Sequence, residues 1–185
     1  MKFAIVIITL LIIAGTAVTF VARGDRNQLR QEREAIDIQW SQVDVALQRR
    51  ADLVPGLVDI LKSYAKQEDE RTAIKQATEA RGALAAARDP QAKIQANVQL
   101  DTPLSRLLVM AEKYPQLRSN ETFQHWHESW EAAENRIAQE RRKYNEAIQR
   151  YNTDIELFPK NIAAAIFGFE RNDAYFKTEP NRVAF

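Results

Sequence analysis

Two histidines and a few scattered serines are the residues of this chain that come nearest to suggesting catalysis or metal binding. His125 and His127 are two positions apart on a predicted helix, so their side chains point to different faces and cannot chelate one ion together. His127 and Glu131 share a face, but the Glu-x-x-His pairs of di-iron bundles are absent from the sequence. No nucleophile-elbow glycines surround the serines, and no glycine-rich phosphate loop occurs. The sequence therefore predicts no metal site and no catalytic or cofactor-binding residue.

Charged residues that interrupt apolar helical stripes are more informative. Arg50, Arg81, Glu134 and Arg141 each occupy a position where the repeat calls for an apolar side chain, and they form the predicted structural polar core. A charge removed from water needs a partner, and losing that partner costs about 3–5 kcal/mol. We expect Glu134 to pair inside the fold with Arg50 or Arg81 and to fix the register of the helices. The alternative is that the arginines lie at the edge of the bundle and extend into solvent.

Four amphipathic segments would position these residues, and no segment has the alternation of a strand. The first has a heptad repeat of apolar residues at Ile36, Trp40, Val43, Leu47, Val54, Leu57, Leu61 and Tyr64. Pro55 lies inside it and predicts either a kink or a helix that restarts at Asp52. The second segment covers about residues 68–88. The third covers about 91–114, where Pro103 marks a kink or a new helix start.

The fourth segment is the longest, and Ser119 or Asn120 is its predicted N-cap. Its apolar positions advance by 4 and 3 in strict alternation: Phe123, His127, Trp130, Glu134, Ile137, Arg141, Tyr144, Ile148, Tyr151, Ile155 and Phe158. Four such helices with short connections indicate an all-α fold, an antiparallel four-helix bundle over residues 25–158.

Residues 3–22 form an uncharged run, FAIVIITLLIIAGTAVTFVA. As a helix this run would be about 30 Å long, the thickness of the hydrocarbon core of a bilayer. A cleaved signal peptide is the alternative, with Lys2 as its basic start, but its apolar stretch is usually only about 7–15 residues long. We expect a retained transmembrane helix over residues 1–24, with Phe3, Leu10 and Phe20 in contact with the membrane.

Basic residues beside the apolar run predict its orientation, because they favour the cytoplasmic side. The N-terminal side offers Lys2 and the α-amino group, whereas the other side offers Arg23, Arg26, Arg30 and Arg33. This asymmetry places the N-terminus outside and the bundle in the cytoplasm. The alternative places the bundle in the periplasm.

An even number of bundle helices would return the chain to the membrane, so residues 159–185 form a predicted aromatic-rich tail near the bilayer. Phe167 and Phe169 are its expected membrane contacts. The alternative is that this tail folds against the base of the first helix or against a neighbouring subunit, because Glu170, Arg171 and Asp173 interrupt its apolar surface.

Composition excludes several classes of protein. The chain has 185 residues with 26 Lys and Arg against 25 Asp and Glu, which gives no basic field for nucleic-acid binding. It has no Cys, so disulfides, Cys-ligated metals and thiol nucleophiles are excluded. Only 5 Gly and 6 Pro occur, and this scarcity of turn residues favours helices over a sandwich or barrel of many strands.

Six stretches of the sequence, in this order, resemble the LemA family of bacterial membrane proteins. They are WSQVDVALQRRADLVPGLV (40–58), TEAR (78–81), LSRLLVMAEKYPQLRSNETF (104–123), ENRIA (134–138), YNEAIQRYN (144–152) and FPKNIAAAIFGF (158–169). The resemblance implies a bacterial inner-membrane protein with one N-terminal transmembrane helix and an antiparallel helical bundle on the cytoplasmic side. It implies no catalytic residue, cofactor or substrate.

These observations together predict a membrane-anchored helical scaffold or adaptor. We expect it to act through protein–protein contact and self-association, with membrane organisation as one form of that role. Its expected partners are the lipid bilayer, further copies of the chain and an unidentified protein, but no nucleic acid. An enzyme is not expected, because a tightly packed bundle seldom has a pocket with convergent acids. The alternative is a non-catalytic component of a membrane transport or channel assembly.

Overall fold

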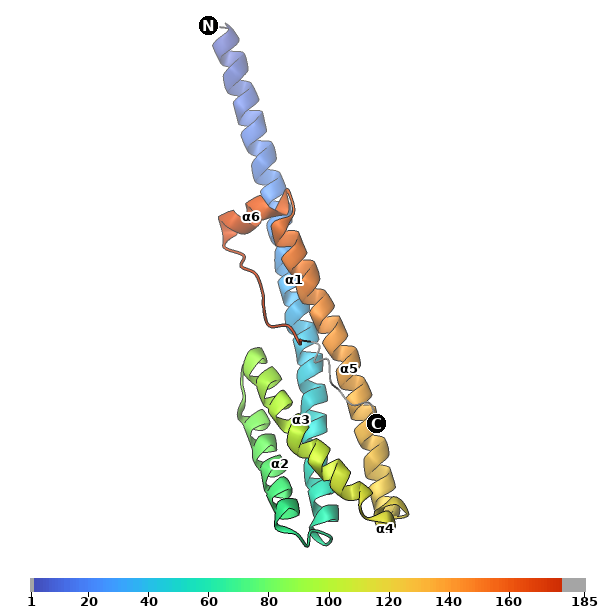
Figure 1. The fold of residues 1–185 in the computed structure, drawn as a ribbon. Helices are drawn as coiled ribbons and strands as arrows, with labels where there is room; N and C mark the ends of the chain where they lie inside the picture. The colour runs from blue at the N-terminus through green and yellow to red at the C-terminus, as the bar shows by residue number, and fades with distance from the viewer. Residues whose placement is uncertain (1, 178–185) are drawn as a thin grey trace. The chain divides into compact units, whose positions relative to one another are not determined.

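Helices make up most of residues 2–177, the part of the chain that this computed structural model describes; side chains are described from Arg23 onward, except that of Arg118. In chain order the helices are α1 Lys2–Lys62, α2 Glu68–Ala86, α3 Pro90–Glu112, α4 Pro115–Arg118, α5 Glu121–Glu156 and α6 Lys160–Phe167 (Figure 1). No strand occurs within residues 2–177, so the predicted all-α class is confirmed.

The two interior prolines do not divide their helices. α1 continues through Pro55 to Lys62, which excludes the predicted restart at Asp52. α3 likewise runs through Pro103 without a new start. Each proline lacks the N–H that would bond the carbonyl four residues earlier, so each of these helices carries an open carbonyl in its interior. In α1 that carbonyl belongs to Ala51.

Polar side chains begin the bundle helices, as N-caps do. Asp89 accepts a hydrogen bond from the Ala92 N–H at 2.8 Å, and Asn120, one of the two predicted caps, accepts one from the Phe123 N–H at 3.1 Å. At the start of α2, the Glu70 carboxylate accepts bonds from the Lys66 and Gln67 N–H groups. These bonds, with one from the Tyr114 hydroxyl, outweigh burial and lower the pKa of Glu70.

The chain divides into two compact units, each drawing on part of α1 and part of α5. One comprises Met1–Gln39 with Tyr144–Tyr175, and the other comprises Trp40–Lys143 with Phe176–Phe185. They are called here the α6 unit and the bundle unit. The bundle unit has an apolar core to which four long helices contribute, with Leu57 of α1, Ala77 of α2, Leu104 of α3 and Trp130 of α5 among its members.

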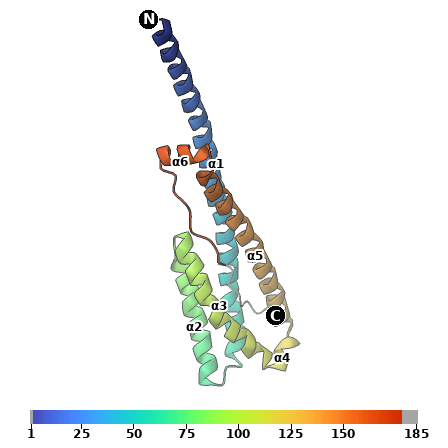
Figure 2. The same cartoon turned by 45° about the horizontal axis from the view of Figure 1, so that its top comes forward.

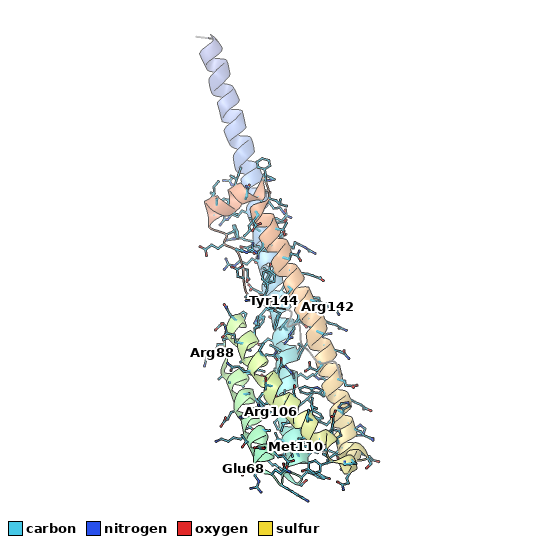
Figure 3. All side chains as sticks on the ribbon, viewed as in Figure 1. Glu68, Arg88, Arg106, Met110, Arg142 and Tyr144 are labelled. Carbon is cyan, nitrogen blue, oxygen red and sulfur yellow. The ribbon has the colours of Figure 1, made fainter. Side chains whose placement is uncertain are left out.

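Within the bundle unit, α2 and α3 lie side by side and run in opposite directions (Figure 1 and Figure 2). Glu68 is the first residue of α2, and Arg88 follows the end of that helix (Figure 3). Arg106 of α3 donates a hydrogen bond to Gln76 of α2 at 3.0 Å, while Met110 is buried in the core between the helices.

The α6 unit has a smaller core, in which Ala163 and Ala164 pack on Leu29 of α1 together with Ile155 and Phe169. Both views show α6 lying across α1 and not along it (Figure 1 and Figure 2). Gly168 ends α6 in the left-handed conformation with φ of 69°, which a residue with a Cβ adopts only at a cost.

Side chains of α5 hold the extended segment that follows α6. The Asn152 amide donates to the Asn172 carbonyl oxygen at 2.7 Å, and its own oxygen accepts from the Asn172 N–H at 2.9 Å. The Tyr151 hydroxyl donates to the Glu170 carbonyl oxygen at 2.8 Å. The first part of the predicted tail, residues 160–175, is therefore an ordered part of the α6 unit.

The predicted transmembrane run, including Phe3, Leu10 and Phe20, lies outside the residues whose side chains are described. Its backbone belongs to α1. Among the residues that the structure does describe in full, no helix has an apolar stretch of the length needed to cross a bilayer.

Candidate functional site

Arg50 of α1 is a charged residue in the interior of the bundle unit, with only 4% of its surface exposed. Each of its three guanidinium nitrogens faces an oxygen. Nη1 donates to Asn97 Oδ1 at 2.7 Å, Nη2 donates to Asp101 Oδ1 at 2.5 Å, and Nε lies 2.7 Å from Glu134 Oε1. These four residues, with Trp130, are called here the Arg50 hub.

Trp130 stacks on this guanidinium, whose central carbon lies 5.1 Å from the ring centroid. The polar partners come from α3 and α5, so one side chain of α1 links three helices. Two carboxylates face a single positive charge, and bonds to a charged group are about twice as strong as neutral ones. Because each guanidinium nitrogen of Arg50 lies against an oxygen of α3 or α5, the hub can hold the register of these helices.

Arg81 of α2 occupies the defect that Pro55 creates in α1. Its Nε donates to the Ala51 carbonyl oxygen at 3.1 Å, the carbonyl that Pro55 leaves without a helical donor. Its Nη2 also lies 3.7 Å from Asp52 Oδ1. A buried carbonyl without a donor costs about 1–3 kcal/mol, and Arg81 removes that cost.

Trp126 of α5 reaches the same stretch of α1 from another side. Its indole N–H donates to the Leu53 carbonyl oxygen at 2.8 Å. A Cβ on Gly56 would lie 3.4 Å from the Trp126 ring, at van der Waals contact, so this glycine lies directly beside the indole. The segment from Arg50 to Gly56 is therefore contacted by α2, α3 and α5.

The structure brings together only part of the predicted polar core. Glu134 pairs with Arg50 and not with Arg81. Arg81 binds the α1 backbone, and Arg141 lies over the ring of Phe176, with 4.6 Å between guanidinium carbon and centroid. Phe176 also stacks on Trp40, with 6.3 Å between the centroids.

Sequence reasoning missed two partners of Arg50, Asn97 and Asp101. They lie between Ile94 and Leu104 at steps of 3 and 4 residues, so they interrupt the apolar face of α3 as Arg50 interrupts that of α1, and this spacing was a signal that could have found them. Sequence reasoning also placed His127 in the apolar seam of α5, where Trp126 is buried and His127 is exposed. The paired tryptophans four residues apart were the signal for that register, since both are large apolar residues on one helical face.

A second group of charges holds the start of α6 in the α6 unit. The Lys160 ammonium forms an ion pair with Asp154 of α5 and lies 3.6 Å from Glu32 of α1. Burial raises the pKa of Glu32 above its ordinary 4.5, and the hydrogen bond to Asp154 and the charge of that residue raise it further. Burial alone would raise the pKa of Asp154, but the hydrogen bonds from Lys160 and Glu32 outweigh it and hold that pKa below its ordinary 3.8. Glu32, Asp154 and Lys160 are called here the lysine cluster.

The histidines form local pairs on the surface of α5. His127 Nε2 lies 3.3 Å from Glu131, and His125 Nδ1 lies 3.7 Å from Glu128. Across the residues with described side chains, no three His, Asp or Glu residues are arranged to hold a metal ion.

The model of the LemA family matches residues 39–184, which include the whole Arg50 hub. This chain belongs to the LemA family. The predicted resemblance is thus confirmed, and in this LemA protein the stretch RRADLVPG contains Arg50, Ala51, Leu53, Pro55 and Gly56, on which the three other long helices converge.

The LemA chain is also similar to three curated proteins of magnetic bacteria. Magnetosome proteins MamQ 1 and MamQ 2 of Paramagnetospirillum magneticum are each 40% identical to it over 77 residues. Magnetosome protein MamQ of Magnetospirillum gryphiswaldense is 36% identical over 77 residues. Each match covers 42% of this chain and 28% of the relative, so the similarity spans less than a third of those proteins.

Glu134→Gln tests the Arg50 hub. It removes a charge beside Arg50, and loss of a bond to a charged group costs about 1.5–3 kcal/mol. Each kcal/mol of stability lost lowers the Tm by about 2–4 °C. We therefore expect a lower Tm for the full chain in mild detergent, as measured by circular dichroism. Glu146→Gln is the control, because Glu146 is exposed on the same helix. Equal melting temperatures for the two variants would contradict this role of Glu134.

Arg81→Met and Pro55→Ala, made singly and together, test the link between Arg81 and the open carbonyl. In the presence of Pro55, loss of Arg81 leaves the Ala51 oxygen without a donor. With alanine at position 55, the helix supplies its own N–H. We expect a coupling of about 0.5–1.5 kcal/mol from denaturant unfolding of the four proteins. The ion pair with Asp52 is lost in both backgrounds and cancels, so strict additivity would refute the link.

Glu32→Gln tests the lysine cluster through pH. Because the folded pKa of Glu32 is raised, its contribution to stability is complete below 4.5 and is lost as pH rises through the folded value. Asp154, whose pKa is lowered, stays ionised over that range. We expect Glu32→Gln to raise the Tm at about pH 8 relative to the parent and to leave it nearly unchanged at about pH 4.5. Glu34→Gln, at an exposed position of α1, should show no such difference.

Proposed function

We propose that this LemA-family chain is a membrane-anchored helical scaffold that self-associates. In this proposal residues 3–22 cross the bacterial inner membrane once, and the bundle lies in the cytoplasm. The protein then acts by presenting the bundle surface at the membrane to further copies of itself or to another protein. It performs no chemical step.

The continuity of α1 carries the proposal. This helix extends from Lys2 to Lys62 and contains both the apolar run and the Arg50-to-Gly56 segment of the bundle. The bundle is therefore connected to the apolar run without a loop. A helix that belongs to both parts suits a membrane-anchored protein that acts through contact, because no separate linker segment lies between the anchor and the bundle.

The charges beside the apolar run support the cytoplasmic orientation. Arg23, Arg30 and Arg33 are exposed on α1, and positive side chains near a span favour the cytoplasmic side. Similarity to proteins named for the magnetosome supports a bacterial membrane as the location.

Exposed apolar residues support contact with a partner. Val98 and Val109 of α3 are both exposed, and their spacing of eleven residues places them on one face of that helix. The charges of the Arg50 hub fit a non-catalytic role, because they are used within the fold and hold the helices in register.

The test is the mass of the full chain in mild detergent, measured by light scattering after size exclusion, beside that of a variant lacking residues 1–24. We expect the full chain to form an oligomer of defined copy number and the shortened chain to lose it, because small residues such as Gly15 and Thr19 permit close packing of anchors. Monomers in both cases would overturn self-association.

A separate experiment tests whether residues 3–22 cross the membrane. The full chain mixed with phosphatidylcholine vesicles should float with them through a density gradient and resist extraction by carbonate. Release by carbonate would overturn the membrane-spanning part of the proposal, whatever the oligomeric state.

A further inference from the structure

An open hollow of about 400 Å³ lies between α1 and the end of α6 in the α6 unit. Its α1 wall is formed by Arg26, Arg30 and Arg33, with Glu34 and Asp37 beyond them, and its other wall is Phe167 to Phe169. We call it the arginine hollow. The three arginines follow one another by 4 and 3 residues, so they share one face of the helix. Among the described residues, none of the three forms an ion pair.

We propose that the arginine hollow binds the phosphate-bearing headgroup of an anionic phospholipid. Three guanidinium groups on one face can give paired hydrogen bonds to phosphate oxygens, the geometry for which arginine is preferred over lysine. The function of these residues is otherwise unexplained, because neither the Arg50 hub nor the lysine cluster uses them.

Arg26 is already held in position for such a ligand. Its guanidinium carbon lies 4.9 Å from the centroid of the Phe167 ring. Stacking engages the flat face of the guanidinium and leaves the N–H groups at its edge able to donate. Gly168, in its left-handed conformation, ends α6 between the two aromatic residues of the wall, and the lysine cluster fixes the start of the same helix.

The charges are ordered along α1 in the direction that a membrane requires. At a rise of 1.5 Å per residue, Arg26 lies about 6 Å and Arg33 about 17 Å beyond residue 22, where the apolar run ends. Glu34 and Asp37 follow at a greater distance. Headgroup phosphates lie just outside the hydrocarbon core, so the arginine end of the hollow lies at about the same depth as these phosphates. This step rests on the anchor proposed above.

Exposed apolar residues at the end of α5 and on α6, in the same unit as the hollow, favour a lipid over free phosphate. Leu157, Phe158, Ile162 and Ile166 are all exposed, with 79% of Phe158 and 63% of Ile166 accessible. Ile162 and Ile166 lie one turn apart on α6, whose other side is buried on Leu29 through Ala163 and Ala164. Exposed apolar side chains next to basic ones are typical of a helix that lies in the membrane interface.

The experiment measures lipid retention by the full chain in mild detergent, using native mass spectrometry with phosphatidylglycerol and with phosphatidylcholine of the same acyl chains. We expect preferential binding of phosphatidylglycerol. The variant Arg26→Gln, Arg30→Gln, Arg33→Gln should lose on the order of 100-fold in that affinity, because each arginine near an anionic surface contributes about fivefold.

A control triple variant, Arg71→Gln, Lys75→Gln, Arg142→Gln, removes three exposed charges from the bundle unit and should keep the preference. Melting temperatures of both variants show whether the fold is retained. If it is not, the single change Arg30→Gln, at an exposed position, replaces the triple variant and should weaken the preference about fivefold.

Three outcomes would overturn the proposal. Equal binding of the two lipids would remove the headgroup site. Binding of inorganic phosphate that displaces the lipid, unaffected by Ile162→Ser with Ile166→Ser, would make the hollow a site for free phosphate. Loss of oligomers without loss of lipid in the arginine variant would make it a protein contact. Carbonate extraction of the parent chain tests the anchor separately, because lipid preference in detergent does not depend on spanning.

Discussion

A proline in the interior of a helix leaves one backbone oxygen without a donor, and the bundle unit is organised around this constraint. Arg81 supplies the missing donor to Ala51 from α2. One residue earlier, Arg50 extends to α3 and α5, and two residues later the Leu53 carbonyl oxygen receives the Trp126 indole. Seven consecutive residues of α1 thus specify the position of every other long helix in this unit. Apolar burial supplies most of the stability, but it is not directional and would tolerate sliding.

The sequence was sufficient to predict the long helices, because apolar positions three and four residues apart persist over many turns. It also placed Arg50 in the interior, since that residue replaces a seam position between buried neighbours. The sequence could not identify the partners of Arg50. Glu134 faces Arg50 and not Arg81 because of how the helices pack. The spacing of Asn97 and Asp101 places them on the apolar face of α3, but it does not say which charge they meet. Pro55 suggested a local break, whereas the backbone continues and a distant side chain compensates.

The α6 unit uses charge differently. In the bundle unit a single cation is surrounded by acceptors, whereas the lysine cluster brings two carboxyl groups to one ammonium and lets their pKa values move apart. A carboxyl that holds its proton can donate a hydrogen bond, so Glu32 and Asp154 can lie close together without full repulsion. The arrangement fixes Lys160, the first residue of α6, and with it a short helix whose apolar residues are partly left exposed.

The side chain of Asn152 behaves toward Asn172 as a neighbouring strand would, with one donor and one acceptor opposite the two backbone groups of a single residue. Aspartate could accept but not donate, and a serine hydroxyl could not satisfy both groups at that reach. Glutamine would carry the amide one methylene too far. Asparagine is therefore the side chain that meets this geometric requirement at position 152. If position 152 were the same in all relatives, the cause would be that its side chain replaces a backbone partner. Such invariance is easily mistaken for a sign of catalysis.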